Sequence, residues 1–221
     1  MKEKLIELIK KYKHGWAFSY FLIYIPWFRY LERTVTTSYH IMYSVIDSYI
    51  PFNEYFIVPY YFWFIYMTAT LVYLFLKDAG EFYRYILFLA AGMSFCLFVC
   101  QIYPNGTDFR PVVDESKNWA TKLVAFIHKV DTNTNVFPSI HVYNSIGTHI
   151  AICKSKYLSP IKYMKAFSLI SLLSISASTV FLKQHSIIDV IGAIIIGYIA
   201  YILIYSKVGV PVSESEKAII R

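Results

Sequence analysis

A histidine and a carboxylate close together beside an apolar segment are the first residues in this chain that could do chemistry. His185 and Asp189, in "KQHSIID", are four positions apart and would share one face of a helix. An unpaired Asp is costly there, about 2.5–3.5 kcal/mol at the centre of a membrane helix, so Asp189 needs a partner such as His185. A carboxylate bonded to one imidazole nitrogen leaves the other free to attack phosphorus. A plain interfacial His–Asp pair is the alternative interpretation.

The stretch "FPSIH" at 137–141 brings a second histidine to the start of another apolar segment. Pro138 suits the first turn of a helix, because its missing N–H is not needed there. The backbone N–H groups of Ser139, Ile140 and His141 would then be free at the positive end of the helix, an arrangement that binds anions. The Ser139 hydroxyl adds a donor, and a protonated His141 can act as a general acid. An ordinary helix start with an interfacial histidine is the alternative.

Two cations lie near these histidines in the expected arrangement. Arg110, in "YPNGTDFRP", offers a planar fork for phosphate oxygens, although a single loop arginine is usually only solvated. Lys183 lies two residues before His185, where a cation would bind phosphate and stabilise the charge that develops during transfer. Together the three stretches predict a site that handles phosphate.

The composition indicates that these residues sit in a membrane protein. Of the 221 residues, 57% are hydrophobic and only 16% are charged, and the chain has 21 Tyr and 17 Phe. The net charge of +7 fits a role in topology and contact with anionic headgroups better than nucleic-acid binding. Cys96, Cys100 and Cys153 lie in apolar runs and show neither a disulfide framework nor metal-ligand spacing.

Six apolar segments come close to the roughly 20 residues that cross a bilayer. They are 15–28, 55–76, 85–103, 136–153, 166–182 and 190–206. The first contains Pro26 and becomes long enough if Arg29 snorkels to the interface. It is aromatic-rich and no A-x-A-like site follows it, which favours an uncleaved span over a signal peptide. We therefore expect an all-α, polytopic membrane protein with six transmembrane helices.

The distribution of Lys and Arg predicts the orientation and the limits of the domain. With six spans both termini lie on one side, and placing them in the cytoplasm puts most Lys and Arg there as well. We expect an amphipathic cytoplasmic helix at 1–14, a membrane domain at 15–206 and a cytoplasmic tail at 207–221. The loop at 31–54 is expected to lie along the interface. The three stretches that carry the candidate site residues then meet at the outer face of the cell membrane.

In combination, the three stretches resemble the type 2 phosphatidic acid phosphatase superfamily, whose motifs are K-x6-RP, PSGH and SR-x5-H-x3-D. "FRP" matches the end of the first motif, "PSIH" the second, and S-x6-H-x3-D from Ser178 to Asp189 the third. Their order and the six-span layout also match, over roughly 55–206. Three positions depart from the family: Tyr103 replaces the Lys, Ile140 the Gly and Thr179 the Arg.

One lysine offers a replacement for a missing cation. Lys183 lies four residues after Thr179 and would reach the same volume if that segment is helical. The string "STVFLKQH" also resembles a branch of the family that includes the inositol phosphoceramide synthase-like members.

The resemblance implies a metal-independent lipid phosphatase that cleaves a lipid phosphate monoester or diphosphate at the extracytoplasmic face. By matching position, His185 is the nucleophile that forms a phosphohistidine, Asp189 orients it, and His141 protonates the leaving group. The implied substrate-binding residues are Arg110, Ser139, Ile140 and Lys183. The implied partners are a phospholipid or polyprenyl phosphate and the bilayer, with no nucleic acid, no cofactor and a monomer as the default.

Three other hypotheses stay open at this point. If a lipid or sugar hydroxyl replaces water, the same site becomes a phosphotransferase of the inositol phosphoceramide synthase type. His141, His185 and Asp189 could instead form a metal site of two histidines and one carboxylate. The missing family cations are also compatible with a non-catalytic lipid-binding relative.

Overall fold

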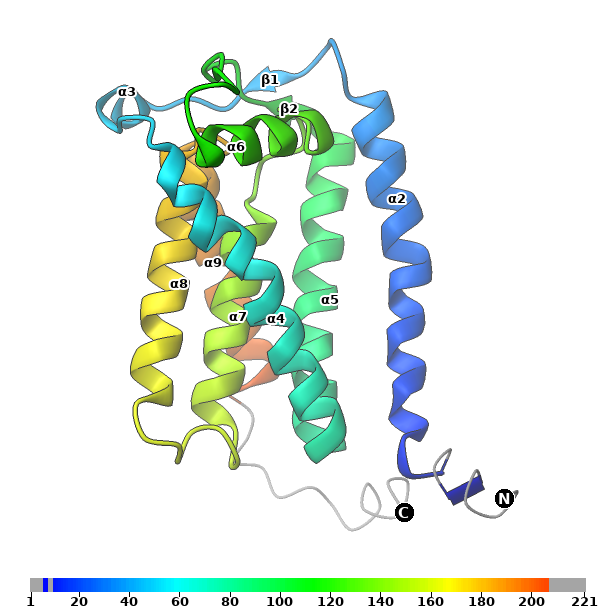
Figure 1. The fold of residues 1–221 in the computed structure, drawn as a ribbon. Helices are drawn as coiled ribbons and strands as arrows, with labels where there is room; N and C mark the ends of the chain where they lie inside the picture. Colours follow the sequence, from blue (N-terminus) through cyan, green and yellow to red (C-terminus); the bar gives the residue numbers. More distant parts are fainter. Residues whose placement is uncertain (1–5, 8–9, 207–221) are drawn as a thin grey trace.

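The computed structural model describes residues 6–7 and 10–206, and these are mostly helical. Of the expected surface helix at 1–14, residues 1–5 and 8–9 lie outside the described part, as does the whole expected tail at 207–221. Helices that run the length of the molecule form the body, and shorter elements cover one of its ends (Figure 1).

The first long helical segment lies at the side of the bundle. The 3-10 helix η1 (Lys13–Tyr20) continues without a break into α2 (Phe21–Thr34), which contains Pro26. α2 packs on α5 (Ala79–Ile102) and stands apart from α4 (Ile57–Lys77) in Figure 1. Trp27 Nε1 donates to Gln101 Oε1 at 2.8 Å and fixes this pairing.

The other long helices surround α7 (Ile140–Lys154). It packs against α8 (Met164–Phe181), α5, α9 (Ile187–Ile204) and α4. Close approach of α5 and α7 depends on Gly92, where a Cβ would come within 1.9 Å of the Tyr143 ring. Because α7 is central, its first turn lies where several helices meet.

Short elements cover the end of the bundle at which α7 begins. They are α3 (Val45–Tyr49), the 3-10 helix η2 (Glu54–Phe56), α6 (Trp119–Val130) and the parallel pair β1 (His40–Ile41) and β2 (Asn105–Gly106). The Asn105 side chain accepts from the N–H groups of Val136 at 3.0 Å and Phe137 at 2.7 Å. It thereby fixes the segment that leads into α7.

Four of the six expected membrane spans are long and apolar enough to cross a bilayer. They are Glu54–Lys77, Ala79–Ile102, Met164–Phe181 and Ile187–Ile204. The six-span prediction is therefore not confirmed. α7 has 15 residues, about 22 Å of helix, which is shorter than the apolar core of a bilayer. α2 carries Arg29, Glu32 and Arg33 in its second half.

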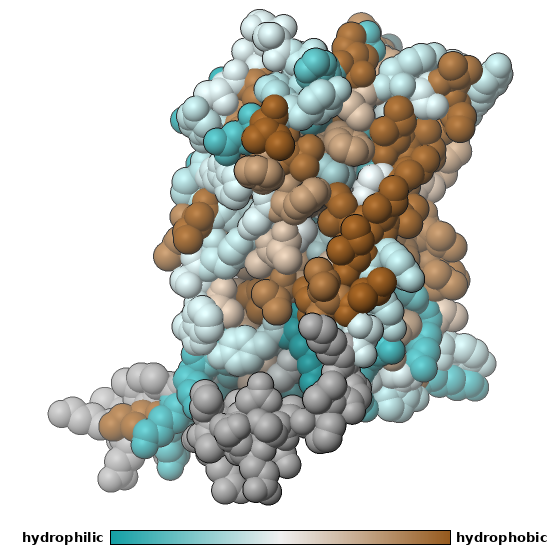
Figure 2. Space-filling view, turned by 180° about the vertical axis from the view of Figure 1, so that it is seen from behind, coloured by the Kyte–Doolittle hydropathy of each residue, from teal (hydrophilic) through white to brown (hydrophobic). Residues whose placement is uncertain are grey.

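The surface of the bundle carries many large apolar side chains. Figure 2 shows them gathered over the middle of the face seen from behind. Among the most exposed are Leu22, Ile23, Ile65, Ile170, Tyr198 and Leu203, each more than 60% exposed. Burying such a surface in lipid removes the cost of its contact with water.

Candidate active site

The Asp189 side chain contacts both the N-cap residue of a helix and the His185 ring. Ser186 is the N-cap of α9, and its N–H donates to Asp189 Oδ2 at 2.9 Å. The same oxygen lies 3.2 Å from His185 Nδ1. Asp189 is fully buried and His185 is 7% exposed. The carboxylate therefore fixes the imidazole and directs its Nε2 away from the cap, as the spacing in the sequence predicts.

The two motif histidines meet, although they are 44 residues apart in the chain. His185 Nε2 lies 3.4 Å from His141 Nδ1, and the ring centroids are 5.6 Å apart at an interplanar angle of 65°. His141 occupies the first turn of α7, where it packs against the rings of Tyr60 at 4.7 Å and Trp63 at 4.5 Å. These two aromatic residues of α4 hold the ring in place, and the sequence analysis did not identify them.

Both imidazoles line a cavity of about 410 Å³ that lies between α2 and α4 and beneath α6. Its polar end is formed by Glu32, Asp131, Thr132, Thr134 and Asn135 together with the imidazoles. Further from this end, the side chains of α2 and α4 that line it are apolar or aromatic. This volume falls in the range of small-ligand sites.

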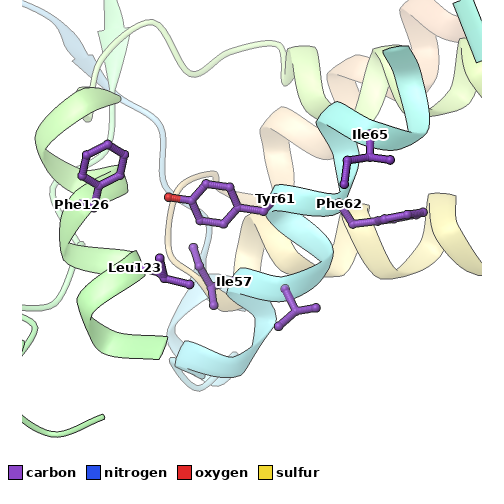
Figure 3. A pocket seen from close by; sticks show the side chains of 7 residues that line it. Ile57, Tyr61, Phe62, Ile65, Leu123 and Phe126 are labelled. Carbon is purple, nitrogen blue, oxygen red and sulfur yellow. The ribbon is translucent and has the colours of Figure 1, made fainter. Parts of the chain in front are cut away.

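A second hollow, of about 690 Å³, lies between α4 and α6 (Figure 3). Its walls include Ile57, Tyr61 and Ile65 of α4 and Leu123 and Phe126 of α6. The Tyr61 hydroxyl is the only polar side-chain group among the described residues that line it. It therefore offers no chemistry of its own.

Arg110 does not line the cavity in the part of the chain that the structure describes. Its Nη1 donates to the carbonyl oxygen of Asp131 and its Nη2 to that of Thr132, each at 2.7 Å, and Nη2 also contacts the Gln184 side chain. Burial lowers the pKa of Arg110, and the nearby Asp131 charge opposes that shift. The guanidinium fork thus holds the loop that forms the polar end of the cavity.

Lys183 is not among the described residues that line the cavity with the histidines. α8 ends at Phe181, and Lys183 has a left-handed φ of 59°, so the helical segment that would carry its ammonium to the volume of Thr179 is not present. This expectation was wrong because the chain turns there: the Thr179 carbonyl accepts from the N–H groups of both Gln184 and His185. Lys183 Nζ donates to the Asp47 carbonyl at 2.7 Å, and burial lowers the pKa of this group.

Ser139 and Ile140 lie beside the histidines in different ways. Ser139 is fully buried as the N-cap of α7, and its Oγ accepts from the Val142 N–H at 3.4 Å. Its own N–H donates to the Asp189 carbonyl at 3.2 Å, so the expectation that this group is free was wrong. The bond joins the start of α7, which carries His141, to the first turn of α9, which follows His185. Ile140 lines the cavity.

Asp47 is a supporting residue that the sequence analysis missed. This 3% exposed carboxylate accepts from Ser186 Oγ at 2.5 Å and from the Ile187 N–H at 2.9 Å. It also accepts from the Ser44 N–H at 2.8 Å within a capping box that starts α3. The Ser-x-x-Asp pattern could have revealed the cap. It could not reveal the contact with the turn that carries His185.

Two more carboxylates line the polar end and were also missed. Asp131 Oδ2 accepts from the Tyr60 hydroxyl at 2.9 Å. Glu32 of α2 accepts from Thr132 Oγ1 at 2.6 Å and from Asn135 Nδ2 at 2.8 Å. Among the described residues that line the cavity there is no Lys or Arg. A phosphate bound in this cavity would therefore be surrounded by acidic and polar side chains, whereas the sequence predicted cationic ones.

The geometry does not favour the metal hypothesis. Asp189, His185 and His141 form a linear chain, because the carboxylate bonds one nitrogen of His185 and His141 approaches the other. A metal ion needs these groups to converge on one point. Within the described residues, no group of three or more His, Cys, Asp or Glu side chains is arranged to hold a metal ion.

Comparison with known proteins identifies the family of this site. Residues 107–210 match the PAP2 superfamily, a segment that contains Arg110, His141, His185 and Asp189. This part of the chain belongs to the PAP2 superfamily. The resemblance of the three motifs is thereby confirmed, and a phosphatase-type lipid phosphoesterase is the activity that the PAP2 match suggests. No curated protein and no solved structure matches the chain.

Proposed function

We propose that this PAP2 protein is a membrane enzyme that hydrolyses a lipid phosphate monoester or diphosphate through a phosphohistidine, at the extracytoplasmic face. The observation that carries the proposal is the chain of contacts from Asp189 through His185 to His141, with both imidazoles lining one cavity. A buried carboxylate, a nucleophile held by it and an adjacent acid are the parts that two-step phosphoryl transfer needs.

In the first step, His185 Nε2 attacks phosphorus, so that a P–N bond forms and the P–O bond to the leaving alcohol or phosphate breaks. His141 gives its proton to the departing oxygen, and Asp189 stabilises the charge on the His185 ring. In the second step, water attacks phosphorus, loses a proton to His141 and breaks the P–N bond. Inorganic phosphate leaves and both histidines return to their starting state.

If a lipid or sugar hydroxyl takes the place of water, the second step transfers the phosphoryl group, which is the alternative of the inositol phosphoceramide synthase type. The same residues serve both reactions. The choice depends on which acceptor reaches the cavity beside His141.

A second candidate function is that of a non-catalytic, lipid-binding relative. The observation that favours it is the commitment of both candidate cations to backbone carbonyls: Arg110 to the 131–132 segment and Lys183 to α3. With no Lys or Arg among the described residues that line the cavity, charge that develops on the phosphoryl oxygens would depend on the histidines and on neutral donors.

The decisive experiment measures phosphate release by the purified protein from phosphatidic acid, phosphatidylglycerol phosphate and polyprenyl diphosphate. We expect release from at least one of them, unchanged by a chelator, inhibited by vanadate and reduced to background in His185→Ala. His40→Ala is the matched control, because His40 is exposed and stacks on Tyr103 outside the cavity. Activity that survives in His185→Ala would contradict the mechanism. No release from any of the three lipids would favour the non-catalytic relative.

A further inference from the structure

The polar end of the histidine cavity holds two carboxylates that are not paired with a basic side chain. Glu32 and Asp131 both line the cavity, and neither forms an ion pair with a Lys or Arg of the described residues. Arg110 interacts with both charges at a distance, but its Nη atoms donate to the carbonyl oxygens of Asp131 and Thr132. Because Arg110 supplies one positive charge for two negative ones, this set of three groups remains negative.

Two oxygen acceptors at this end have no hydrogen-bond donor within the part of the chain that the structure describes. Asn135 Nδ2 donates to Glu32 Oε1 at 2.8 Å, which fixes the amide so that its buried Oδ1 is the atom without a partner. The Tyr60 hydroxyl donates to Asp131 Oδ2 at 2.9 Å, and no described donor bonds the other oxygen of that carboxylate. Unused acceptors are uncommon in folded proteins. Beside a cavity they indicate a ligand that carries N–H or O–H groups.

Aromatic rings form much of the remaining wall of the cavity. Tyr60 and Trp63 of α4 line it, and so do Tyr24 and Phe28 of α2. The face of an aromatic ring attracts a cation within about 6 Å, and Trp does so most strongly. Carboxylates combined with aromatic rings are suited to an organic ammonium group, whereas Mg²⁺ and Ca²⁺ bind through oxygen ligands alone. The composition of the wall therefore favours an ammonium group over a metal ion.

Tyr60 connects the acidic end of the cavity with the histidines. Its ring packs on the His141 ring, with the centroids 4.7 Å apart, while its hydroxyl donates to Asp131 at 2.9 Å. A single tyrosine side chain therefore separates the carboxylate from the imidazole that approaches His185. One molecule with a phosphate at His185 and an ammonium group at Asp131 needs only a short linker between the two.

We propose that Glu32, Asp131 and Asn135 form a binding site for an ammonium group of the substrate, so that the enzyme selects lipids with an aminoethyl phosphate unit. In this unit the amine lies two carbons from a phosphate ester oxygen. Its N–H groups would meet the unused acceptors, and its charge would offset the repulsion between phosphate and carboxylates. The inference rests on the proposed function, because His185 attacks the phosphorus of the same molecule.

An aminoethyl phosphate unit has two sources among lipids. In a sphingoid-base phosphate, which is a monoester, the amine belongs to the lipid alcohol that His185 displaces. In phosphatidylethanolamine, which is a diester, the amine belongs to the headgroup, and His185 displaces diacylglycerol before water releases phosphoethanolamine. In both cases His141 protonates the departing oxygen and then takes a proton from water.

The first test compares substrates that differ in the charge of the amine. Sphinganine 1-phosphate is compared with its N-acetyl derivative by phosphate release, and phosphatidylethanolamine with its N-acetyl derivative by diacylglycerol release. We expect kcat/KM to be about tenfold higher for the amine in one of the two comparisons, which identifies the source. In Glu32→Gln and Asp131→Asn this preference should fall about fivefold, whereas Glu115→Gln, at an exposed carboxylate that pairs with Lys129, should keep it. Equal values for amine and N-acetyl forms, or an unchanged preference in both cavity variants, would overturn the proposal.

The second test does not need turnover. Thermal midpoints of His185→Ala in detergent are measured with each of the four lipids, because a ligand that binds the folded state raises the midpoint. We expect a larger rise with an amine than with its N-acetyl form, and no such difference when Glu32→Gln is added. This difference without product release by wild type would contradict the proposed function alone, whereas equal rises would overturn the ammonium site alone. A rise with Mg²⁺ or Ca²⁺ that EDTA and Glu32→Gln abolish would assign the acidic end to a metal ion and overturn the proposal as well.

Discussion

At the scale of single residues, the charge of the cavity constrains the binding of a phosphate that the proposed reaction requires. Glu32 and Asp131 line the polar end, and the described lining residues include no Lys or Arg to balance them. A dianionic headgroup beside two carboxylates is disfavoured, because like charges at the distances within one cavity repel strongly at low local dielectric. The neutral donors of Thr132 and Asn135 are used in part by Glu32 itself.

Replacing one of these carboxylates should therefore improve binding of an anionic lipid. In Glu32→Gln we expect the KM for phosphatidic acid to fall about fivefold, or about 1 kcal/mol, with kcat little changed. The glutamine can still accept a hydrogen bond from Thr132, so the loop keeps a contact. Steady-state kinetics at low and high salt would check this. Glu115→Gln is the control, since Glu115 is exposed and pairs with Lys129. A rise in KM would show that Glu32 serves the substrate instead of repelling it.

The contacts between His185, Asp189 and His141 could be predicted from the sequence, but the residues around them could not. The four-residue spacing of His185 and Asp189 dictates their contact, so that pair follows from helix geometry alone. The meeting of His141 with His185 was expected from shared placement at one face of the membrane. Tyr60, which packs on His141, and Asp131, which it binds, lie 71 residues apart in segments without any motif.

At the scale of elements, α3 supports the turn between α8 and α9. The carboxylate of Asp47 accepts from Ser186 and Ile187, next to the residue that is the proposed nucleophile. The loop at 31–54 was expected only to lie along the interface, because its apolar residues show no periodicity that reveals a contact 140 residues away. A five-residue helix of this kind is defined by its partners rather than by its own sequence.

Removing the Asp47 carboxylate should loosen this turn. Asp47→Ala leaves the Ser186 hydroxyl and the Ile187 N–H buried without acceptors, at a cost of about 1–3 kcal/mol for such groups. We expect a lower midpoint in thermal unfolding, followed by intrinsic fluorescence in detergent, and a fall in kcat larger than the change in KM. Asp114→Ala is the control, because Asp114 caps an exposed turn through Ser116. An unchanged midpoint would show that α3 is not a support.

α6, which covers the cavity, contains a histidine that should make stability depend on pH. Burial, and then the positive charge of Arg110, lower the pKa of His128 to about 4. The unfolded chain has a histidine pKa near 6.5, so between about 6.5 and 4 it binds a proton that the folded state does not. Stability should therefore fall as pH falls through this window, and stay constant with respect to this group above it.

The measurement compares thermal midpoints of wild type and His128→Gln at several pH values between 7.5 and 4.5. The difference between the two proteins should shift in favour of the variant as pH falls, whatever other groups titrate in both. His40→Gln, at an exposed position, should follow wild type. Parallel curves for wild type and His128→Gln would show that protonated His128 is accommodated in the folded state.

At the scale of the whole molecule, the helix directions place the proposed site and most basic residues at opposite ends. α7 and α9 both begin beside the histidines, while the α4–α5 and α7–α8 connections lie at the far end (Figure 1). The sequence predicted this arrangement from charge-free runs and their connections. It could not predict that α7 would have only 15 residues, because helix length there is set by the Ser139 cap and by Ser155, where the helix ends.

The basic residues at the far end predict which side of the membrane it occupies. Lys77, Lys154, Lys156, Lys162 and Lys165 lie in or beside the α4–α5 and α7–α8 connections, and such residues stay in the cytoplasm. The site would then face outward. Ser116→Cys, in the exposed loop before α6, should react with a membrane-impermeant maleimide in intact cells, and Lys162→Cys only after permeabilisation. Cys153 is replaced by Ser in both variants, whereas Cys96 and Cys100 are buried and can remain. The opposite labelling pattern would place the histidines on the cytoplasmic side and contradict a site at the extracytoplasmic face.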